Sequence, residues 1–94
     1  MFDVSRGEND KVLLSGRLDA SQVEKLKGVL DTVTRSCTLD FNELEYISSA
    51  GLGVLLATQK RLSDSGHRLK LVNLNKHIRN IFAVAGFDFI FEIE

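Results

Sequence analysis

Two adjacent serines, Ser48 and Ser49, stand directly before a predicted helix whose first turn contains two glycines, Gly51 and Gly53. A glycine inside a helix costs about 1 kcal/mol of stability relative to alanine, so a chain selected only for helix stability would not place two of them there. A turn without Cβ atoms lets another backbone, a phosphate or an enzyme's active site come close to the hydroxyls. The segment therefore suggests a surface at which a second molecule reaches a serine.

The same serines also have a purely structural interpretation. Either hydroxyl can cap the helix by accepting a hydrogen bond from a free amide, and the glycines then ease a tight connection from the preceding strand. A phosphate on either serine would face unpaired N–H groups and the positive end of the helix dipole. Taken alone, the segment favours the capping interpretation.

Several kinds of chemistry are not expected from this sequence. No histidine or lysine lies near the serines in sequence to activate them, and the Gly-Leu-Gly of residues 51–53 is too short for a dinucleotide or Walker loop. The chain has one cysteine, Cys37, and two distant histidines, which provide neither a disulfide nor a metal-ligand set. We therefore predict no enzymatic activity, no cofactor and no metal, and expect Cys37 to be a small buried hydrophobic residue.

Length and composition predict a single domain over residues 1–94. Apolar residues make up 44% of the chain and charged residues 27%, which is ordinary for a soluble globular protein. No apolar run approaches the ~20 residues needed to cross a bilayer, and the N-terminus lacks the basic start and apolar block of a signal peptide. We expect a cytoplasmic protein without membrane insertion.

Charge is unevenly distributed, although the formal net charge is only −1. Residues 60–79 carry six lysines and arginines against one acidic residue, Asp64, and such a patch could meet nucleic acid or an acidic protein surface. These cations are spaced among apolar residues as on a solvated face, and no aromatic residue accompanies them for stacking on bases. We expect no direct binding of nucleic acid.

Hydrophobic periodicity divides the chain into alternating strands and helices. Strands are predicted at residues 2–6, 12–14, 38–41, 69–72 and 89–93, and helices at 23 to about 35, 52–62 and 78–85. Turns are expected at 7–10, 16–19 and 65–67, an irregular connection at 42–47, a helix cap at Asn75 and a helix end at Gly86. Phe41 and Tyr46 are expected in the core, and His67 and His77 at the surface.

The order of these elements, β-β-α-β-α-β-α-β, predicts an α/β domain with an opening hairpin followed by a mostly parallel sheet. In such sheets the loops after the carboxyl ends of the strands carry the function. Two of these loops are unusual here, at residues 18–21 before the first helix and at residues 47–50 before the second.

The chain resembles the STAS domain, and within it the bacterial anti-sigma factor antagonists, also called anti-anti-sigma factors. The resemblance covers nearly the whole chain and rests chiefly on residues 40–53, from the strand-end Asp40 to the Gly-Leu-Gly. A second match is the Gly-Arg-Leu-Asp of residues 16–19, which is similar to the family's Gly-x-Leu/Ile-Asp. A weaker third match is the last helix with its exit at Gly86-Phe87.

The resemblance implies a regulatory phosphoprotein that acts by partner switching in transcription regulation. The residue in the phosphoacceptor position is Ser49, with Ser48 as the alternate. Phosphate would be added by an ATP-binding serine kinase that is also the anti-sigma factor, and removed by a metal-dependent serine phosphatase. The chain departs from the Asp-Ser-Ser/Thr-Gly-Leu-Gly pattern of sigma-factor regulators, with Ser48 replacing the aspartate and Ala50 the second hydroxyl. It also ends after the fifth predicted strand, where many relatives add a helix.

The resemblance also implies a partner-binding surface formed by Asp19, Ser48, Ala50, Gly51, Leu52 and Gly53. Asp19 is in the first place a candidate helix cap, and in the resemblance it lies beside the phosphoacceptor. In the alternative function the chain has the same fold but is not switched by phosphorylation. STAS domains also serve as non-phosphorylated subunits of ABC-type lipid transporters or of sensory complexes.

Overall fold

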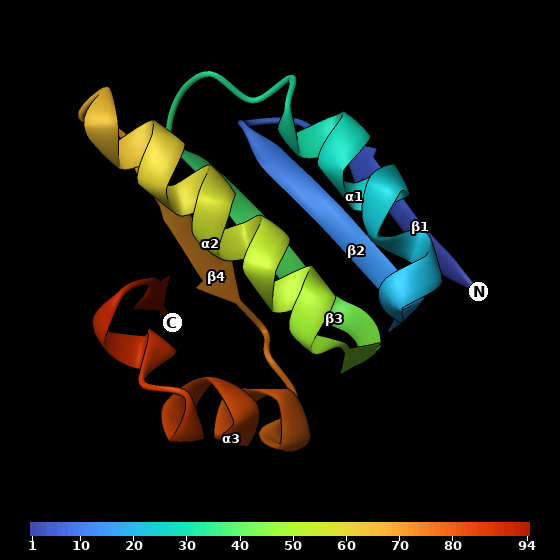
Figure 1. Ribbon diagram of the computed structural model, residues 1–94. Helices are drawn as coiled ribbons and strands as arrows, with labels where there is room; N and C mark the ends of the chain where they lie inside the picture. The colour runs from blue at the N-terminus through green and yellow to red at the C-terminus, as the bar shows by residue number, and fades with distance from the viewer.

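The computed structural model describes residues 1–94 and contains one five-stranded sheet in the order β1-β2-β3-β4-β5 (Figure 1). β1 is antiparallel to β2, and every later pair is parallel. The predicted α/β class, opening hairpin and parallel sheet are therefore confirmed. The strands are β1 Phe2–Arg6, β2 Lys11–Leu18, β3 Cys37–Ile47, β4 Leu69–Val72 and β5 Glu92–Ile93.

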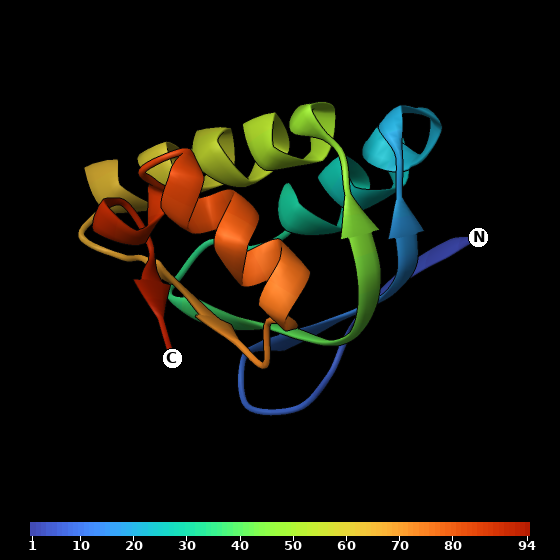
Figure 2. The same cartoon turned by 90° about the horizontal axis from the view of Figure 1, so that it is seen from below.

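Three α-helices cover one face of this curved sheet, and the opposite face is open (Figure 2). α1 and α2 lie side by side, α1 over the β1–β2 side of the sheet and α2 over β3, and α3 lies on the same face near the end of β4 (Figures 1 and 2). The helical segments are η1 Ala20–Gln22, α1 Val23–Leu30, α2 Ser49–Asp64, α3 Lys76–Val84 and η2 Phe87–Phe89.

The core lies between the sheet and the helices and contains 20 buried apolar residues. Phe82 of α3 is fully buried in this core and packs edge-to-face on Phe41 of β3, with ring centroids 6.0 Å apart. The Phe91 ring also contacts Phe82, with ring centroids 5.8 Å apart. Cys37 is buried in this cluster as expected, and its removal from water raises the pKa of the thiol to about 11.

The prediction of an irregular connection at residues 42–47 is wrong, because β3 continues through this segment to Ile47. Its pairing with β2 shifts register twice, once between Leu13 and Ser15 and once between Gly16 and Arg17. Each shift adds an unmatched residue to β3, which interrupts the alternation of buried and exposed side chains. The sequence pattern consequently looked irregular although the backbone remains a strand.

The predicted break of the second strand at residues 16–19 is also wrong, since β2 extends to Leu18. Gly16 has a φ of +85° and lies against the first residue of the chain, where a Cβ would collide with the carbonyl oxygen of Met1. The amide of Arg17 donates to that same carbonyl at 2.8 Å. The absence of a Cβ at Gly16 therefore lets the start of β1 approach β2 closely enough to form this hydrogen bond.

Two other elements are shorter than predicted. α1 ends at Leu30 instead of near residue 35, and Arg61 of α2 closes that end by donating to the carbonyls of Leu30 and Val33, both at 2.9 Å. The last strand contains only Glu92–Ile93 because the chain first makes the turn η2, in which Phe89 is 93% exposed.

The predicted boundaries of α3 are confirmed. The side chain of Asn75 caps the helix by accepting a hydrogen bond from the amide of Ile78 at 2.8 Å. Gly86 ends it with a φ of +76°, the left-handed conformation typical of a residue just past a helix.

The basic segment of residues 60–79 is partly neutralised by the end of the chain. Arg68 pairs with Glu92 at 3.2 Å and Lys70 with Glu94 at 2.7 Å, and the Glu94 carboxylate raises the pKa of Lys70. Arg61 is committed to the two carbonyls at the end of α1. This arrangement supports the interpretation of the segment as a solvated face. No helix is both long enough and apolar enough to traverse a lipid bilayer.

Candidate functional site

The two loops singled out from the sequence come together at the carboxyl ends of β2 and β3. Leu18 and Ile47 are register partners at the ends of these strands. One residue further on, the amide of Ser48 donates to the carbonyl of Leu18 at 2.9 Å. Asp19 and the serine pair are therefore held at the same edge of the sheet, where the first turn of α2 begins.

Ser48 is the N-cap of α2. Its backbone is extended, with φ −85° and ψ 166°, and its Oγ accepts a hydrogen bond from the amide of Gly51 at 3.1 Å. Its carbonyl accepts the first helical bond, from the amide of Leu52 at 3.0 Å. The side chain is half-buried. The capping interpretation is thus confirmed for Ser48.

Ser49 is the first residue of α2 and has a different environment. Its side chain is exposed, and its hydroxyl makes no hydrogen bond within the chain. The first-turn amides and the helix dipole lie next to it, which is a favourable place for an added anion. Of the two serines, Ser49 has the accessible and uncommitted hydroxyl.

This difference predicts opposite responses to the loss of each hydroxyl. Ser48→Ala is expected to reduce the free energy of unfolding by about 1 kcal/mol because the Gly51 amide loses its acceptor. Ser49→Ala is the matched control and should change it by no more than about 0.5 kcal/mol. Urea denaturation followed by circular dichroism measures both, and equal effects would contradict the assignment of the cap to Ser48.

Asp19 is a cap, as predicted, but its helical segment is the short turn η1. One carboxylate oxygen accepts from the amide of Ser21 at 3.0 Å and from its hydroxyl at 2.6 Å. The bond from the Ser21 hydroxyl lowers the pKa of Asp19. No hydrogen bond joins Asp19 to Ser48 or Ser49, so the structure places it beside the serines without linking it to them.

The two glycines of the first turn are not equivalent. Gly51 is buried, and a Cβ there would lie 2.8 Å from Cδ2 of Leu18 and 3.1 Å from Cγ1 of Ile47. The missing Cβ at Gly51 therefore serves the packing of α2 on the ends of β2 and β3, and a contribution of Gly51 to partner binding stays a prediction. Gly53 is exposed, and a Cβ added there would meet no atom within 4 Å. Gly53 is therefore still a candidate contact.

A shallow groove between α1 and α2 continues from this turn. It has a volume of about 400 Å³, and its lining includes the small residues Ala50, Gly53 and Ala57. Its rim carries the ion pair between Lys27 and Asp31, 2.9 Å apart. Ala50 is exposed and Leu52 is half-buried. A partner that contacts Ser49 would therefore meet a surface of low relief along α2.

Tyr46 lies outside the core, contrary to the prediction, whereas Phe41 is fully buried as expected. Tyr46 is half-buried, and the guanidinium carbon of Arg17 lies 4.6 Å from the centre of its ring. This pair could not be identified from the sequence, because the two register shifts between β2 and β3 decide which residues become neighbours. His77 is exposed, and His67 is half-buried near Ser36.

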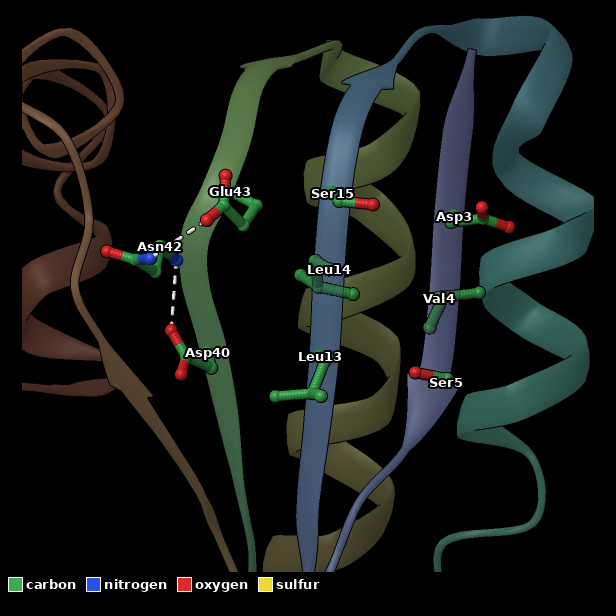
Figure 3. A pocket seen from close by; sticks show the side chains of 9 residues that line it. All are labelled: Asp3, Val4, Ser5, Leu13, Leu14, Ser15, Asp40, Asn42 and Glu43. Carbon is green, nitrogen blue, oxygen red and sulfur yellow. Dashed lines mark hydrogen bonds between the residues drawn. The ribbon is translucent and has the colours of Figure 1, made fainter.

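A second hollow lies on the open face of the sheet (Figure 3). Asp40, from the motif of residues 40–53, accepts hydrogen bonds there from the Asn42 amide at 2.9 Å and from Nδ2 of Asn73 at 3.1 Å. These bonds brace the β3 bulge and the loop after β4. The hollow is about 650 Å³ in volume and is lined by Asp3, Val4, Ser5, Leu13, Leu14, Ser15, Asp40, Asn42 and Glu43.

Comparison with known proteins assigns the family. A family model described as "Mlab, STAS domain" matches residues 1–92, so the chain belongs to the STAS-domain family. The chain is 37% identical over 84 residues to a putative anti-sigma factor antagonist, BtrV, of Bordetella bronchiseptica, covering 85% of this chain and 72% of that protein. It is 30% identical over 95 residues to the anti-sigma-B factor antagonist of Bacillus subtilis, covering 97% of this chain and 87% of that protein.

Solved structures agree on the fold. An anti-sigma factor antagonist from Mycobacterium paratuberculosis superposes with a TM-score of 0.87 at 21% identity, covering 99% of this chain and 85% of that one. The phosphorylated form of the Bacillus cell fate determinant SpoIIAA superposes with a TM-score of 0.71 at 22% identity, covering 100% of this chain and 91% of that one. The resemblance to the STAS fold is thereby confirmed.

Proposed function

We propose that this chain is an anti-sigma factor antagonist whose unmodified form binds a serine-kinase anti-sigma factor and is released when Ser49 is phosphorylated. The observation that carries the proposal is the Ser49 hydroxyl, exposed and without a partner on the first turn of α2. The names of the relatives from Bordetella bronchiseptica and Bacillus subtilis support the same class of function.

The switch follows from one local change in charge. A phosphate adds about −1.5 to −2 charges and three acceptor oxygens, which the start of a helix holds without a large rearrangement. At a docked surface the same group introduces bulk and charge that the partner must accommodate or repel. Gly53 and Ala50, exposed beside Ser49, leave the hydroxyl open to a kinase.

In this proposal the chain is a substrate and a ligand, and its partners do the chemistry. No side chain of the first turn of α2 can act as a base toward Ser49. The kinase partner would bind ATP, and a metal-dependent serine phosphatase would restore the hydroxyl. We expect the cycle in the cytoplasm, where sigma factors act, with Asp19, Ser48, Ala50, Leu52 and Gly53 around the contact.

The test is to identify the partner and locate the phosphate. A pull-down from the native cell with wild-type bait should retain a serine-kinase anti-sigma factor. The purified kinase with ATP should then add a single phosphate, which peptide mass spectrometry places on Ser49. Ser49→Ala should abolish the reaction, and Ser48→Ala, the neighbouring control, should retain it. Phosphorylation of Ser49→Ala at the full rate would assign the site to Ser48.

A second candidate is a non-phosphorylated subunit of an ABC-type lipid transporter or of a sensory complex. It is favoured by Ser48 and Ala50, which differ from the pattern of sigma-factor regulators. In that case the pull-down should retain transporter or sensory subunits, equally with wild-type and Ser49→Asp bait.

A further inference from the structure

We propose that Arg17, held on the ring of Tyr46, recognises an acidic side chain of the partner next to the Ser49 switch. The proposal deepens the proposed function and rests on it, because it concerns the same docking event. Arg17 of β2 and Tyr46 of β3 are register partners on these neighbouring strands.

The position of the pair connects it to the switch. Arg17 and Tyr46 directly precede Leu18 and Ile47, the last residues of the two strands. Leu18 and Ile47 are buried toward the helices, so the alternation of a strand turns the preceding side chains to the open face. The amide of Ser48 is bonded to Leu18, and the pair therefore lies just below the serine loop, at the rim of the proposed contact.

The state of the guanidinium indicates what it can bind. Arg17 is exposed and lies 4.6 Å from the Tyr46 ring centre, yet none of the six ion pairs of the structure includes it. Stacking on an aromatic ring fixes the orientation of the guanidinium plane while leaving its N–H groups free at the edge. Such a fork bonds a carboxylate in a bidentate manner at a reduced entropic cost.

The chemistry of a guanidinium with free N–H groups favours a carboxylate as the partner group. Two acidic residues are near the pair in sequence: Asp19, which has one carboxylate oxygen committed to Ser21, and Glu45, and neither makes an ion pair with Arg17. The phosphate of Ser49 itself is the other possible anion. We assign the partner's carboxylate because Arg17 faces the open side of the sheet, whereas Ser49 begins a helix on the covered side.

The inference predicts that Arg17→Ala weakens binding of the purified serine-kinase anti-sigma factor by about tenfold. Titration calorimetry should be done in the Ser49→Ala background, so that no phosphate contributes. Arg35→Ala is the control, because Arg35 is an exposed arginine two residues before β3 begins, far from the serine loop, where it pairs with Asp10 at 3.0 Å. The affinity of Arg35→Ala should stay within about twofold of its parent. Tyr46→Leu should lose part of the affinity through loss of the stacking surface. A circular-dichroism melt verifies that all variants are folded.

The outcomes separate this inference from the proposed function. If Arg17→Ala binds as tightly as its parent while Ser49→Asp fails to bind, the switch stands and the role of Arg17 is refuted. If Arg17→Ala leaves the affinity unchanged in the Ser49→Ala background but changes the affinity of the form phosphorylated at Ser49, the arginine serves the chain's own anion and the inference is also refuted. If the parent itself binds no kinase-type partner, the proposed function has failed first.

Discussion

Replacing Ser49 with aspartate should weaken binding of the anti-sigma factor by about thirtyfold or more, whereas Ser49→Ala should bind like the unmodified protein. The aspartate puts a charge on an exposed turn that the complex would have to desolvate or oppose. An unfavourable charge of this kind at a desolvated contact costs about 2–5 kcal/mol. Alanine leaves the same surface small and neutral, so it should bind constitutively.

Calorimetry on the wild type and the two variants measures this switch directly. Because Ser49 makes no hydrogen bond within the chain, both variants should melt close to the wild type, and changes in affinity can be assigned to the contact. Ser48→Asp offers a further comparison, since aspartate is also a good N-cap and should keep the helix start intact. Equal affinities for wild type, Ser49→Ala and Ser49→Asp would rule out the switch and favour the non-phosphorylated subunit.

The fold class and the loops of the site were predictable because they depend on local patterns. Strand and helix periodicity gave the β-β-α-β-α-β-α-β order, and the geometry of parallel sheets brought residues 18–21 and 47–50 to one edge. The cap at Asn75 and the helix end at Gly86 were likewise readable from residue type and position. Each of these features requires knowledge of only a few consecutive residues.

The errors arose where the answer depends on a distant part of the chain. The β3 bulges exist only relative to β2, and Gly16 can be understood only beside the carbonyl of Met1. The end of α1 is closed by Arg61, which is 31 residues away from Leu30. Phe89 falls in the predicted strand of residues 89–93, but it lies in a turn because β5 pairs with β4 only from Glu92.

The candidate site shows the same division. The sequence indicated that a serine at this turn is special, but it could not decide between a cap and an acceptor. The structure assigns the cap to Ser48 and leaves the Ser49 hydroxyl uncommitted. It also separates the two glycines, because Gly51 packs on the ends of β2 and β3 while Gly53 faces open space. In this short segment, Ser48 and Gly51 therefore stabilise the fold, whereas Ser49 and Gly53 are exposed to a partner.

The different environments of Gly51 and Gly53 predict opposite effects of substitution on stability. Gly51→Val should lower the free energy of unfolding by about 3 kcal/mol, because its Cβ would lie 2.8 Å from a Leu18 side chain that is fully buried and cannot move away. Gly53→Ala is the matched control in the same turn. Its Cβ meets no atom within 4 Å, so replacing a helical glycine should raise stability by up to about 1 kcal/mol.

Thermal melts followed by circular dichroism decide between these expectations. In a chain of 94 residues, a loss of about 3 kcal/mol lowers the Tm by roughly 12–24 °C, whereas the Gly53→Ala variant should melt at or above the wild-type temperature. Binding titrations on the folded fraction complete the comparison, and Gly51→Val molecules that remain folded should keep most of their affinity for the anti-sigma factor. A Gly51→Val protein that melts like the wild type but no longer binds would show that the bare turn serves the partner, as the sequence first suggested, rather than the packing of α2 on Leu18.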